Sequence, residues 1–178
     1  DAPTALAMHP TGTRLYVARN NTSLVAVVNC STHAVVRSVT TSGGPCALVY
    51  NETDDKVYAA CYSGNRLAII DATRDSLRAL VPTGEGPTAL CWNSVNDKVY
   101  CGHEDGAWLL VVDGVGDTVL PGPRSEDATS LAYAAAVNRV FVGGYESMRI
   151  LDGATDSVIA YGPNDAAALL GQQRREQM

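Results

Sequence analysis

One pattern occurs four times in this chain and restricts its fold more than any other feature of the sequence. Each copy has a short apolar run, a polar loop and a second apolar run, and the copies lie at residues 14–29, 56–71, 98–113 and 139–152. The first run always contains an aromatic residue, which is Tyr16, Tyr58, Tyr100 or Phe141. The whole pattern recurs about every 42 residues, which falls within the range of propeller repeats. Two apolar runs joined by a short polar loop predict a pair of antiparallel strands.

Two further apolar segments accompany each copy and complete a four-stranded unit. The upstream segments lie at residues 5–8, 47–50, 89–92 and 130–133, and the downstream segments at 35–39, 76–80, 118–120 and 157–161. Four short strands in each repeat are typical of a β-propeller blade. We therefore predict an all-β chain with four four-stranded antiparallel blades, at residues 3–44, 45–86, 87–127 and 128–162.

The C-terminal residues 163–178 depart from the repeat. Asp165 precedes a run of good helix formers, so one expectation is a short helix that this residue caps and that Gly171 interrupts. The other expectation is a frayed terminus without regular structure.

The upstream strands carry pairs of large apolar residues two positions apart. Side chains at this spacing point to the same face of a strand. We expect these pairs to pack between neighbouring blades. They are Leu6 with Met8, Leu48 with Tyr50, Leu90 with Trp92, and Leu131 with Tyr133.

Composition and charge exclude several classes of protein. A chain of 178 residues with 46% hydrophobic and 18% charged residues has the balance of one globular domain. The formal net charge is −6, and no basic cluster exceeds the Arg174–Arg175 pair, so we expect no nucleic-acid partner. No apolar run reaches the roughly 18 residues that a membrane-spanning helix requires.

The five cysteines include no pair with the CxxC spacing of a zinc site, so no metal site is expected. Cys91 and Cys101 stand on either side of the turn NSVNDK and would face each other in a symmetric hairpin. A disulfide between them is one expectation, in an oxidising compartment. The other is two small thiols buried in a core, where free cysteine is common.

At this point the repeats resemble a known family. The runs LYVA, VYAA, VYCG and VFVG, each followed by VVN, IID, VVD or ILD, resemble the YVTN-type β-propeller repeat of surface-layer-like and quinoprotein-amine-dehydrogenase-like propellers. The Gly-Pro between repeats and the turn DGATDS fit as well, and the resemblance spans residues 3 to 161. It implies a bacterial or archaeal protein that is extracellular or on the cell surface, or periplasmic, and that has no established catalytic activity.

Propellers of this type commonly close with seven or eight blades, whereas four occur here. One explanation is continuation in a longer chain, of which this is a piece. Another is an arc that completes a ring as a homodimer, and a third is a closed four-bladed ring. A free arc would expose the apolar faces of its terminal blades.

Catalytic chemistry has little support in the sequence. His9, His33 and His103 occupy non-equivalent positions of the repeat and do not share a metal-binding spacing, and we expect no cofactor. No nucleophile, phosphate-loop or metalloprotease motif occurs. We therefore expect a protein that is not an enzyme. The alternative is a propeller-class enzyme, a lyase or a quinone-dependent dehydrogenase, with His103 and Glu104 as base and partner at the channel mouth.

The loops between the second and third strands are the candidate contact surface. They contain aromatic residues outside the repeated core positions, which are Tyr62, Trp108 and Tyr145. The polar residues beside them are Asn65, Arg66, His103, Glu104, Asp105 and Glu146. Exposed aromatics among mixed charges suit the binding of a protein or a glycan. Alternatively, the aromatic side chains only cover strand edges.

Overall fold

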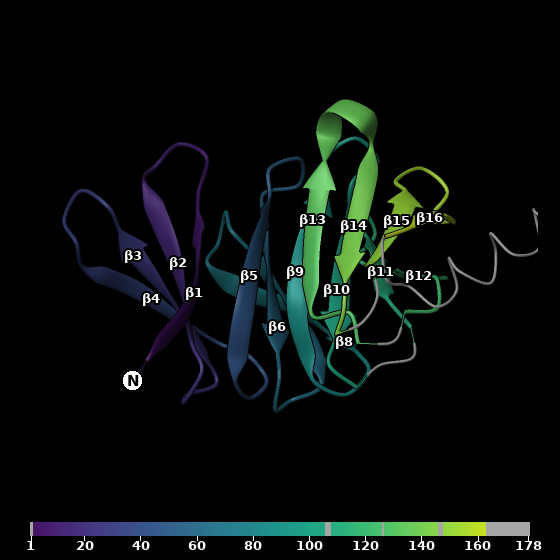
Figure 1. Ribbon diagram of the computed structural model, residues 1–178. Coiled ribbons are helices and arrows are strands. Elements are labelled where there is room, and N and C mark those ends of the chain that lie inside the picture. The colour runs from purple at the N-terminus through teal and green to yellow at the C-terminus, as the bar shows by residue number, and fades with distance from the viewer. Residues whose placement is uncertain (1, 106–107, 126, 146–147, 163–178) are drawn as a thin grey trace, which may run out of the picture.

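The computed structural model of this chain describes residues 2–105, 108–125, 127–145 and 148–162. The chain is all-β and consists of four four-stranded antiparallel blades of the β-propeller type (Figure 1). The described residues contain one helical element, the 3-10 turn η1 (Ala135–Val137). The expected C-terminal helix lies outside the described residues.

Each blade is a sheet in which the strands follow chain order. The first blade contains β1 (Pro3–Met8), β2 (Arg14–Arg19), β3 (Leu24–Asn29) and β4 (Val35–Thr40). The second contains β5 (Pro45–Asn51), β6 (Lys56–Cys61), β7 (Arg66–Asp71) and β8 (Ser76–Pro82). The third contains β9 (Pro87–Asn93), β10 (Lys98–His103), β11 (Leu110–Asp113) and β12 (Val119–Leu120). The fourth contains β13 (Ser130–Ala134), β14 (Arg139–Gly143), β15 (Met148–Asp152) and β16 (Val158–Tyr161).

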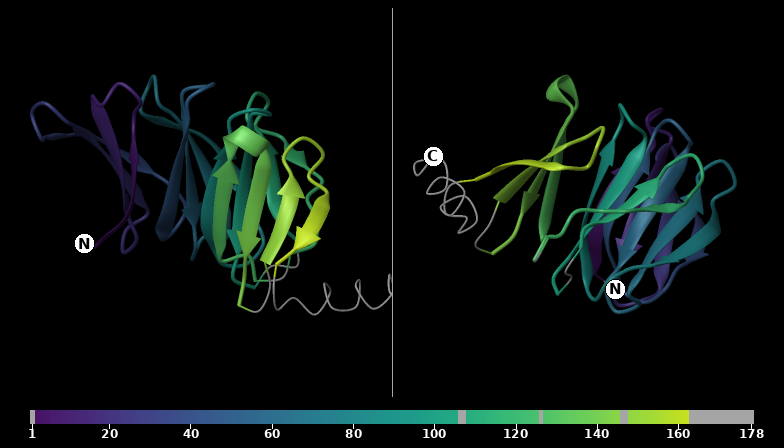
Figure 2. Two further views of the ribbon diagram at one scale, coloured as in Figure 1. Left: turned by 45° about the horizontal axis from the view of Figure 1, so that its top comes forward. Right: turned by 90° about the vertical axis from the view of Figure 1, so that its right-hand side faces the viewer.

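The blades stand side by side as an arc. The first strands β1, β5, β9 and β13 lie next to one another along the inner side, whereas the fourth strands lie apart at the outer edges (Figure 2). This is the packing of propeller blades around an axis. The four sheets therefore meet face to face in three places, and each contact encloses a separate apolar core.

These three cores bury the repeated positions of the sequence. Tyr16, Tyr58 and Tyr100 are fully buried, one in each core. The first-strand pairs of the second, third and fourth blades pack in these cores, as predicted. The prediction is wrong for Leu6 and Met8, which are 61% and 51% exposed. They lie on the side of the first blade that faces away from the second, and no blade covers that side in this structure.

The turns between third and fourth strands share one backbone conformation. Their fifth residue lies in the left-handed region, with φ of 59° at His33, 50° at Asp75, 57° at Asp117 and 61° at Asp156. Asp and Asn adopt this conformation more readily than other residues that carry a side chain. The carboxylate or amide that opens each turn accepts backbone N–H groups, as Asp71 does from Thr73 at 2.9 Å. A side-chain hydrogen bond from Thr73 helps hold the pKa of Asp71 at about 2.

An ion pair, which we call the inter-blade clasp, joins each blade to the next. The basic residue at the start of the second strand of one blade pairs with an aspartate of the next blade. This aspartate is the last residue of the turn between the third and fourth strands, which we call the 3–4 turn. The pairs are Arg14 with Asp75 at 3.2 Å, Lys56 with Asp117 at 2.8 Å, and Lys98 with Asp156 at 2.7 Å. The aspartates at both ends of this series also accept a tyrosine hydroxyl, from Tyr16 at 2.9 Å and from Tyr100 at 2.5 Å. The turns between first and second strands and between third and fourth strands lie at one end of the arc, which we call the turn end. The clasps join neighbouring blades at this end.

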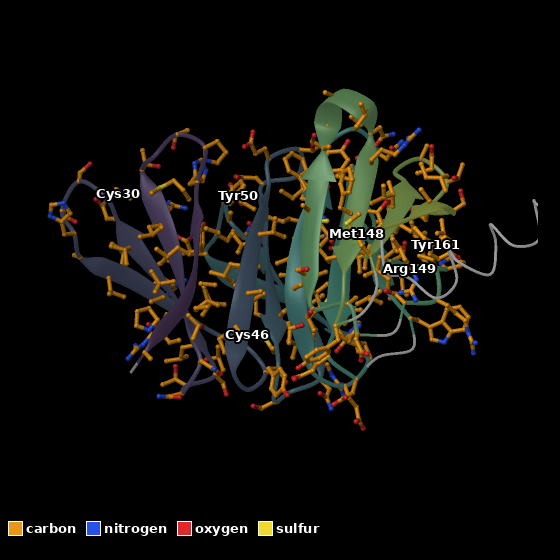
Figure 3. All side chains as sticks on the ribbon, in the orientation of Figure 1. Cys30, Cys46, Tyr50, Met148, Arg149 and Tyr161 are labelled. Atoms are coloured by element: carbon orange, nitrogen blue, oxygen red, sulfur yellow. The ribbon has the colours of Figure 1, made fainter. Side chains whose placement is uncertain are left out.

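Of the two expectations for Cys91 and Cys101, the disulfide is wrong and the two buried thiols are confirmed. The β9–β10 hairpin pairs Asn93 with Lys98, so Cys91 lies opposite Tyr100, and Cys101 lies opposite Leu90. A shift of one residue places two side chains on opposite faces of a sheet. Accordingly, Cys91 packs in the core toward the fourth blade and Cys101 in the core toward the second, and both are free thiols. Cys30 lies near the turn end of the first blade, far from Cys46 (Figure 3).

We expect the thiols of Cys91 and Cys101 to resist alkylation in the native protein. Cys91 is 7% exposed and Cys101 is fully buried. Burial raises the pKa of Cys91 to about 12 and also raises that of Cys101, so both have little reactive thiolate at pH 8. Iodoacetamide followed by peptide mass spectrometry should find both unmodified, and both labelled after denaturation. Recovery of an oxidised Cys91–Cys101 peptide pair from native protein would contradict this register.

Candidate functional site

The loops between second and third strands lie at the same end of the arc as the links that join successive blades. We call this end the 2–3 loop face. Backbone hydrogen bonds connect the two kinds of segment, because Tyr62 N–H donates to the Gly44 carbonyl at 3.0 Å and Glu104 N–H to the Gly86 carbonyl at 3.0 Å. Gly44 and Gly86 have φ of 60° and 59°, a conformation that favours glycine. Each link is therefore held between the loops of the blades that it joins.

Three aromatic side chains on the 2–3 loop face are open to solvent. Tyr62 is 40% exposed, Trp108 is 55% exposed and Tyr145 is 78% exposed. The Arg124 guanidinium stacks 5.2 Å from the centre of the Trp108 ring, which is a cation–π distance. Trp108 is thereby held in a defined position by a neighbouring link, although most of its surface remains accessible.

Tyr62 and Glu104 join two neighbouring blades across the 2–3 loop face. The Tyr62 hydroxyl donates a hydrogen bond of 2.7 Å to the Glu104 carboxylate. This bond raises the pKa of Tyr62 above its ordinary value. Asp105, the next residue, is exposed. The exposed ring of Tyr62 therefore stands beside a carboxylate, whereas that of Trp108 stands beside a guanidinium.

Asn65 and Arg66 serve the loop backbone. Asn65 adopts a φ of 50°, and its side-chain oxygen accepts the Gly86 N–H at 3.2 Å. Arg66 donates to the Asn65 carbonyl at 2.9 Å. These two predicted contact residues thus stabilise the face on which the aromatics stand. Glu146, which was also predicted, lies outside the described residues.

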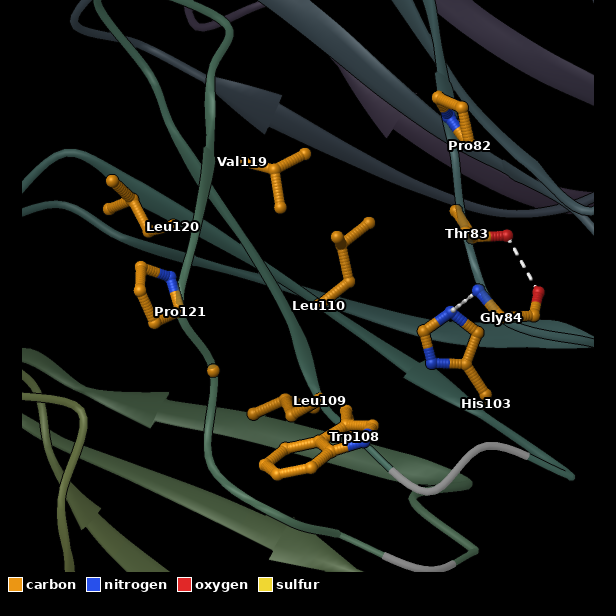
Figure 4. Close-up of a pocket in the computed structure, with 11 residues that line it drawn as sticks. Pro82, Thr83, Gly84, His103, Trp108, Leu109, Leu110, Val119, Leu120 and Pro121 are labelled. Atoms are coloured by element: carbon orange, nitrogen blue, oxygen red, sulfur yellow. Dashed lines mark hydrogen bonds between the residues drawn. The ribbon is translucent and has the colours of Figure 1, made fainter.

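His103 is buried, although it belongs to the same predicted set. The residue is 2% exposed, and its Nε2 accepts the Gly84 N–H at 3.2 Å (Figure 4). Nδ1 must then carry the proton of the neutral ring. Nδ1 lies near the Trp108 backbone and makes no hydrogen bond of good geometry within the described residues. Burial lowers the pKa of His103, so the ring is neutral at pH 7.

An apolar cavity of about 390 Å³ lies beside Trp108 and His103 (Figure 4). It opens between the end of β8 in the second blade and the short outer strand of the third. The side chains that give it its apolar walls are Pro82, Trp108, Leu110, Val119, Leu120 and Pro121. His103 and Thr83 form its polar corner, and the Thr83 hydroxyl is already donated to the Gly84 carbonyl at 2.8 Å.

The cavity exists because the third blade is incomplete at its outer edge. The strand β12 has two residues, whereas the equivalent β8 has seven. Pro121 and Pro123 follow β12 and have no N–H to donate to a neighbouring strand, so regular pairing with β11 ends there. Sequence reasoning missed this cavity, although the prolines after residue 120 were a signal that the strand ends early.

The comparisons with known proteins support the fold alone. No family model matches the chain, and no curated protein matches it. Among solved structures, a chain of hydrazine synthase from Kuenenia stuttgartiensis superimposes with a TM-score of 0.81 at 15% sequence identity. The match covers 89% of this chain and 48% of that chain, so this chain spans about half the length of the structure that it matches. Membership of the YVTN-type family stays a prediction.

The described residues contain no helix with the length and apolar character needed to span a membrane. In the same part of the chain, no group of three or more His, Cys, Asp and Glu side chains is arranged to hold a metal ion.

Proposed function

We propose that this chain is a non-catalytic β-propeller scaffold of a secreted or cell-surface protein, and that it binds a partner protein through the 2–3 loop face. The observation that carries the proposal is the position of Trp108, which is 55% exposed at the edge of an apolar cavity. The extracellular location rests on the resemblance of the repeats to the YVTN type.

The chemistry of the cavity favours a protein over a glycan. Aliphatic and proline side chains form most of its wall, and the Thr83 hydroxyl and His103 Nε2 are already hydrogen-bonded. A sugar would leave its hydroxyl groups without partners there. An apolar side chain of a partner fits, because a buried anchor beside Trp and Arg is the usual centre of a protein interface.

The enzyme alternative has weaker support from the geometry. A base and its partner must both reach the reacting group of one substrate. Glu104 accepts the hydroxyl of Tyr62 at the surface, whereas His103 is buried against Gly84. The two side chains therefore serve different parts of the 2–3 loop face.

We expect Trp108→Ala to weaken partner binding by about 30-fold or more, because the loss of a central aromatic anchor commonly costs 2 kcal/mol or more. The probe is a set of peptides selected on the native chain from a random display library, with affinities measured by calorimetry. The matched control is Val95→Ala, since Val95 is 58% exposed in the same blade but lies in the 1–2 turn at the opposite end.

Two results would contradict the proposal. One is a set of selected peptides that bind with equal affinity to the native chain and to the Trp108→Ala variant. The other is a glycan, found on an array, whose binding depends on Trp108, which would make the partner a sugar. Unchanged circular dichroism must show that the variant is folded, and Trp108→Leu, which keeps apolar bulk, should bind with intermediate affinity.

A further inference from the structure

The outer face of the first blade is an inter-blade surface without a blade on it. It contains Leu6 and Met8 of β1 with Leu15, Val17 and Val28 of the next two strands, which pair across the sheet on the same side. The equivalent side of the second blade is buried in the core that it shares with the first. The repeat thus shows which kind of surface covers this one, namely the opposite face of another blade.

The outer face of the fourth blade is the matching surface. Phe141, Met148 and Ile150 are half-buried there (Met148 is labelled in Figure 3). Their equivalents in the first blade, Tyr16 and Val27, are fully buried against the second blade. The arc therefore ends in two apolar faces of opposite kind, which correspond to the two sides of one inter-blade contact.

The clasp residues are altered at these two ends, and the alterations match. In the first blade the turn position that holds the acceptor aspartate elsewhere is His33, at the same left-handed φ. In the fourth blade the position of the donor tyrosine is Phe141. The basic residue there, Arg139, pairs with Asp152 of its own blade at 2.9 Å. The fourth blade thus lacks the tyrosine hydroxyl of a clasp, and its basic residue is already paired. The first blade lacks the aspartate carboxylate with which a clasp hydroxyl and cation would pair.

We propose that the outer face of the first blade binds the outer face of the fourth blade of a second copy of this chain, head to tail. A blade with the usual Lys-x-Tyr would place an unpaired cation and a hydroxyl beside His33, which is unfavourable for buried polar groups. Phe141 places an apolar ring there instead. Because the two faces differ, the contact is heterologous, and two copies that make it twice form a closed dimer.

The direction of the contact allows a sharp test by sedimentation velocity. Leu6→Lys puts a charge on the outer face of the first blade. Ala132→Lys puts a charge on the outer face of the fourth blade, where Ala132 is exposed and pairs with Phe141 across the sheet. We expect the native chain to be a dimer, and each variant alone to have a dissociation constant at least about 100-fold higher, because burying an unpaired charge is expensive. An equimolar mixture of the two variants should dimerise again through the one junction that remains intact.

Val115→Lys is the control, since Val115 is 68% exposed in the 3–4 turn of the third blade, away from both faces. It should leave the dimer unchanged. A native chain that is monomeric at high micromolar concentration would overturn the proposal and leave these faces for other blades. A dimer that survives Ala132→Lys would also overturn it, because the first faces would then pair with each other. Met8→Lys gives the same readout if Leu6→Lys does not fold.

Discussion

Replacing Asp117 by asparagine is expected to lower the free energy of unfolding by about 3 kcal/mol, the lower end of the range for breaking a buried ion pair. The Lys56 and Asp117 side chains are only 7% and 9% exposed, and the ammonium lies 2.8 Å from the carboxylate. The variant would leave the buried ammonium with Asp54, at 3.8 Å, as its remaining carboxylate, and would also remove the carboxylate that pairs with Arg78. Asparagine is the informative substitution because it tolerates the φ of 57° at this position and still offers an oxygen acceptor.

The matched control for this prediction is Asp75→Asn, the same change in the preceding clasp. Arg14 is 37% exposed there, and solvent screens the charge that the substitution leaves unpaired. We expect a loss of about 1 kcal/mol or less, as for surface ion pairs. Urea unfolding of both variants by fluorescence measures the difference. Equal losses of unfolding free energy would mean that burial does not set the strength of a clasp. They would also mean that solvent screens the Lys56–Asp117 pair as much as the Arg14–Asp75 pair.

Replacing Gly102 by alanine is expected to destabilise the protein by about 3 kcal/mol, the upper end of the usual range for an overpacked core. A Cβ on Gly102 would lie 2.1 Å from the Ala128 carbonyl oxygen and 3.1 Å from the Ala128 side chain. The first contact is with backbone, which no side-chain rotation can relieve. Ala128 is 1% exposed and packs in the core between the third and fourth blades, so it cannot move without displacing its neighbours.

Gly12→Ala is the control for this second prediction. Gly12 has a φ of 70°, and a Cβ there meets nothing within 4 Å. Its substitution should therefore lose only the roughly 1–2 kcal/mol of the left-handed backbone conformation. Thermal unfolding of both variants in the same buffer makes the comparison. If Gly102→Ala unfolds at the same temperature as Gly12→Ala, then the close approach of Ala128 to β10 is absent in solution.

The period of the sequence was sufficient to predict the four blades. Strands in a propeller repeat their environment from blade to blade, so residues such as Tyr16, Tyr58 and Tyr100 return with each period and mark the same place in each sheet. The alternation along the first strands also identified the side chains that pack between blades. It could not show that Leu6 and Met8 have no neighbour, because the repeat contains no information about what lies beyond its first copy.

The candidate site was predictable only in part. Tyr62, Trp108 and Tyr145 were identified because they interrupt the core pattern, and all three are exposed. The cavity beside Trp108 was not predictable from a single blade, since Pro82 comes from the second blade and Pro121 from the end of the third. His103 was grouped with exposed loop residues because it was assigned to the loop after the second strand, whereas it is the last residue of β10 and the structure buries it under the link at Gly84.

The sequence by itself determined the architecture of this protein, because a fourfold pattern of apolar runs and Asp-rich turns has one economical solution in which every run is a strand of one of four packed sheets. Only the tertiary structure decided the register, the clasps and the site. The Cys91–Cys101 pairing failed by one residue of register, which local pattern does not specify closely enough. Lys56 and Asp117 belong to different blades, and Gly102 of β10 meets Ala128 in the link to the fourth blade. Such contacts join residues that are distant in the chain, and their strength depends on burial, which arises only when whole sheets pack together.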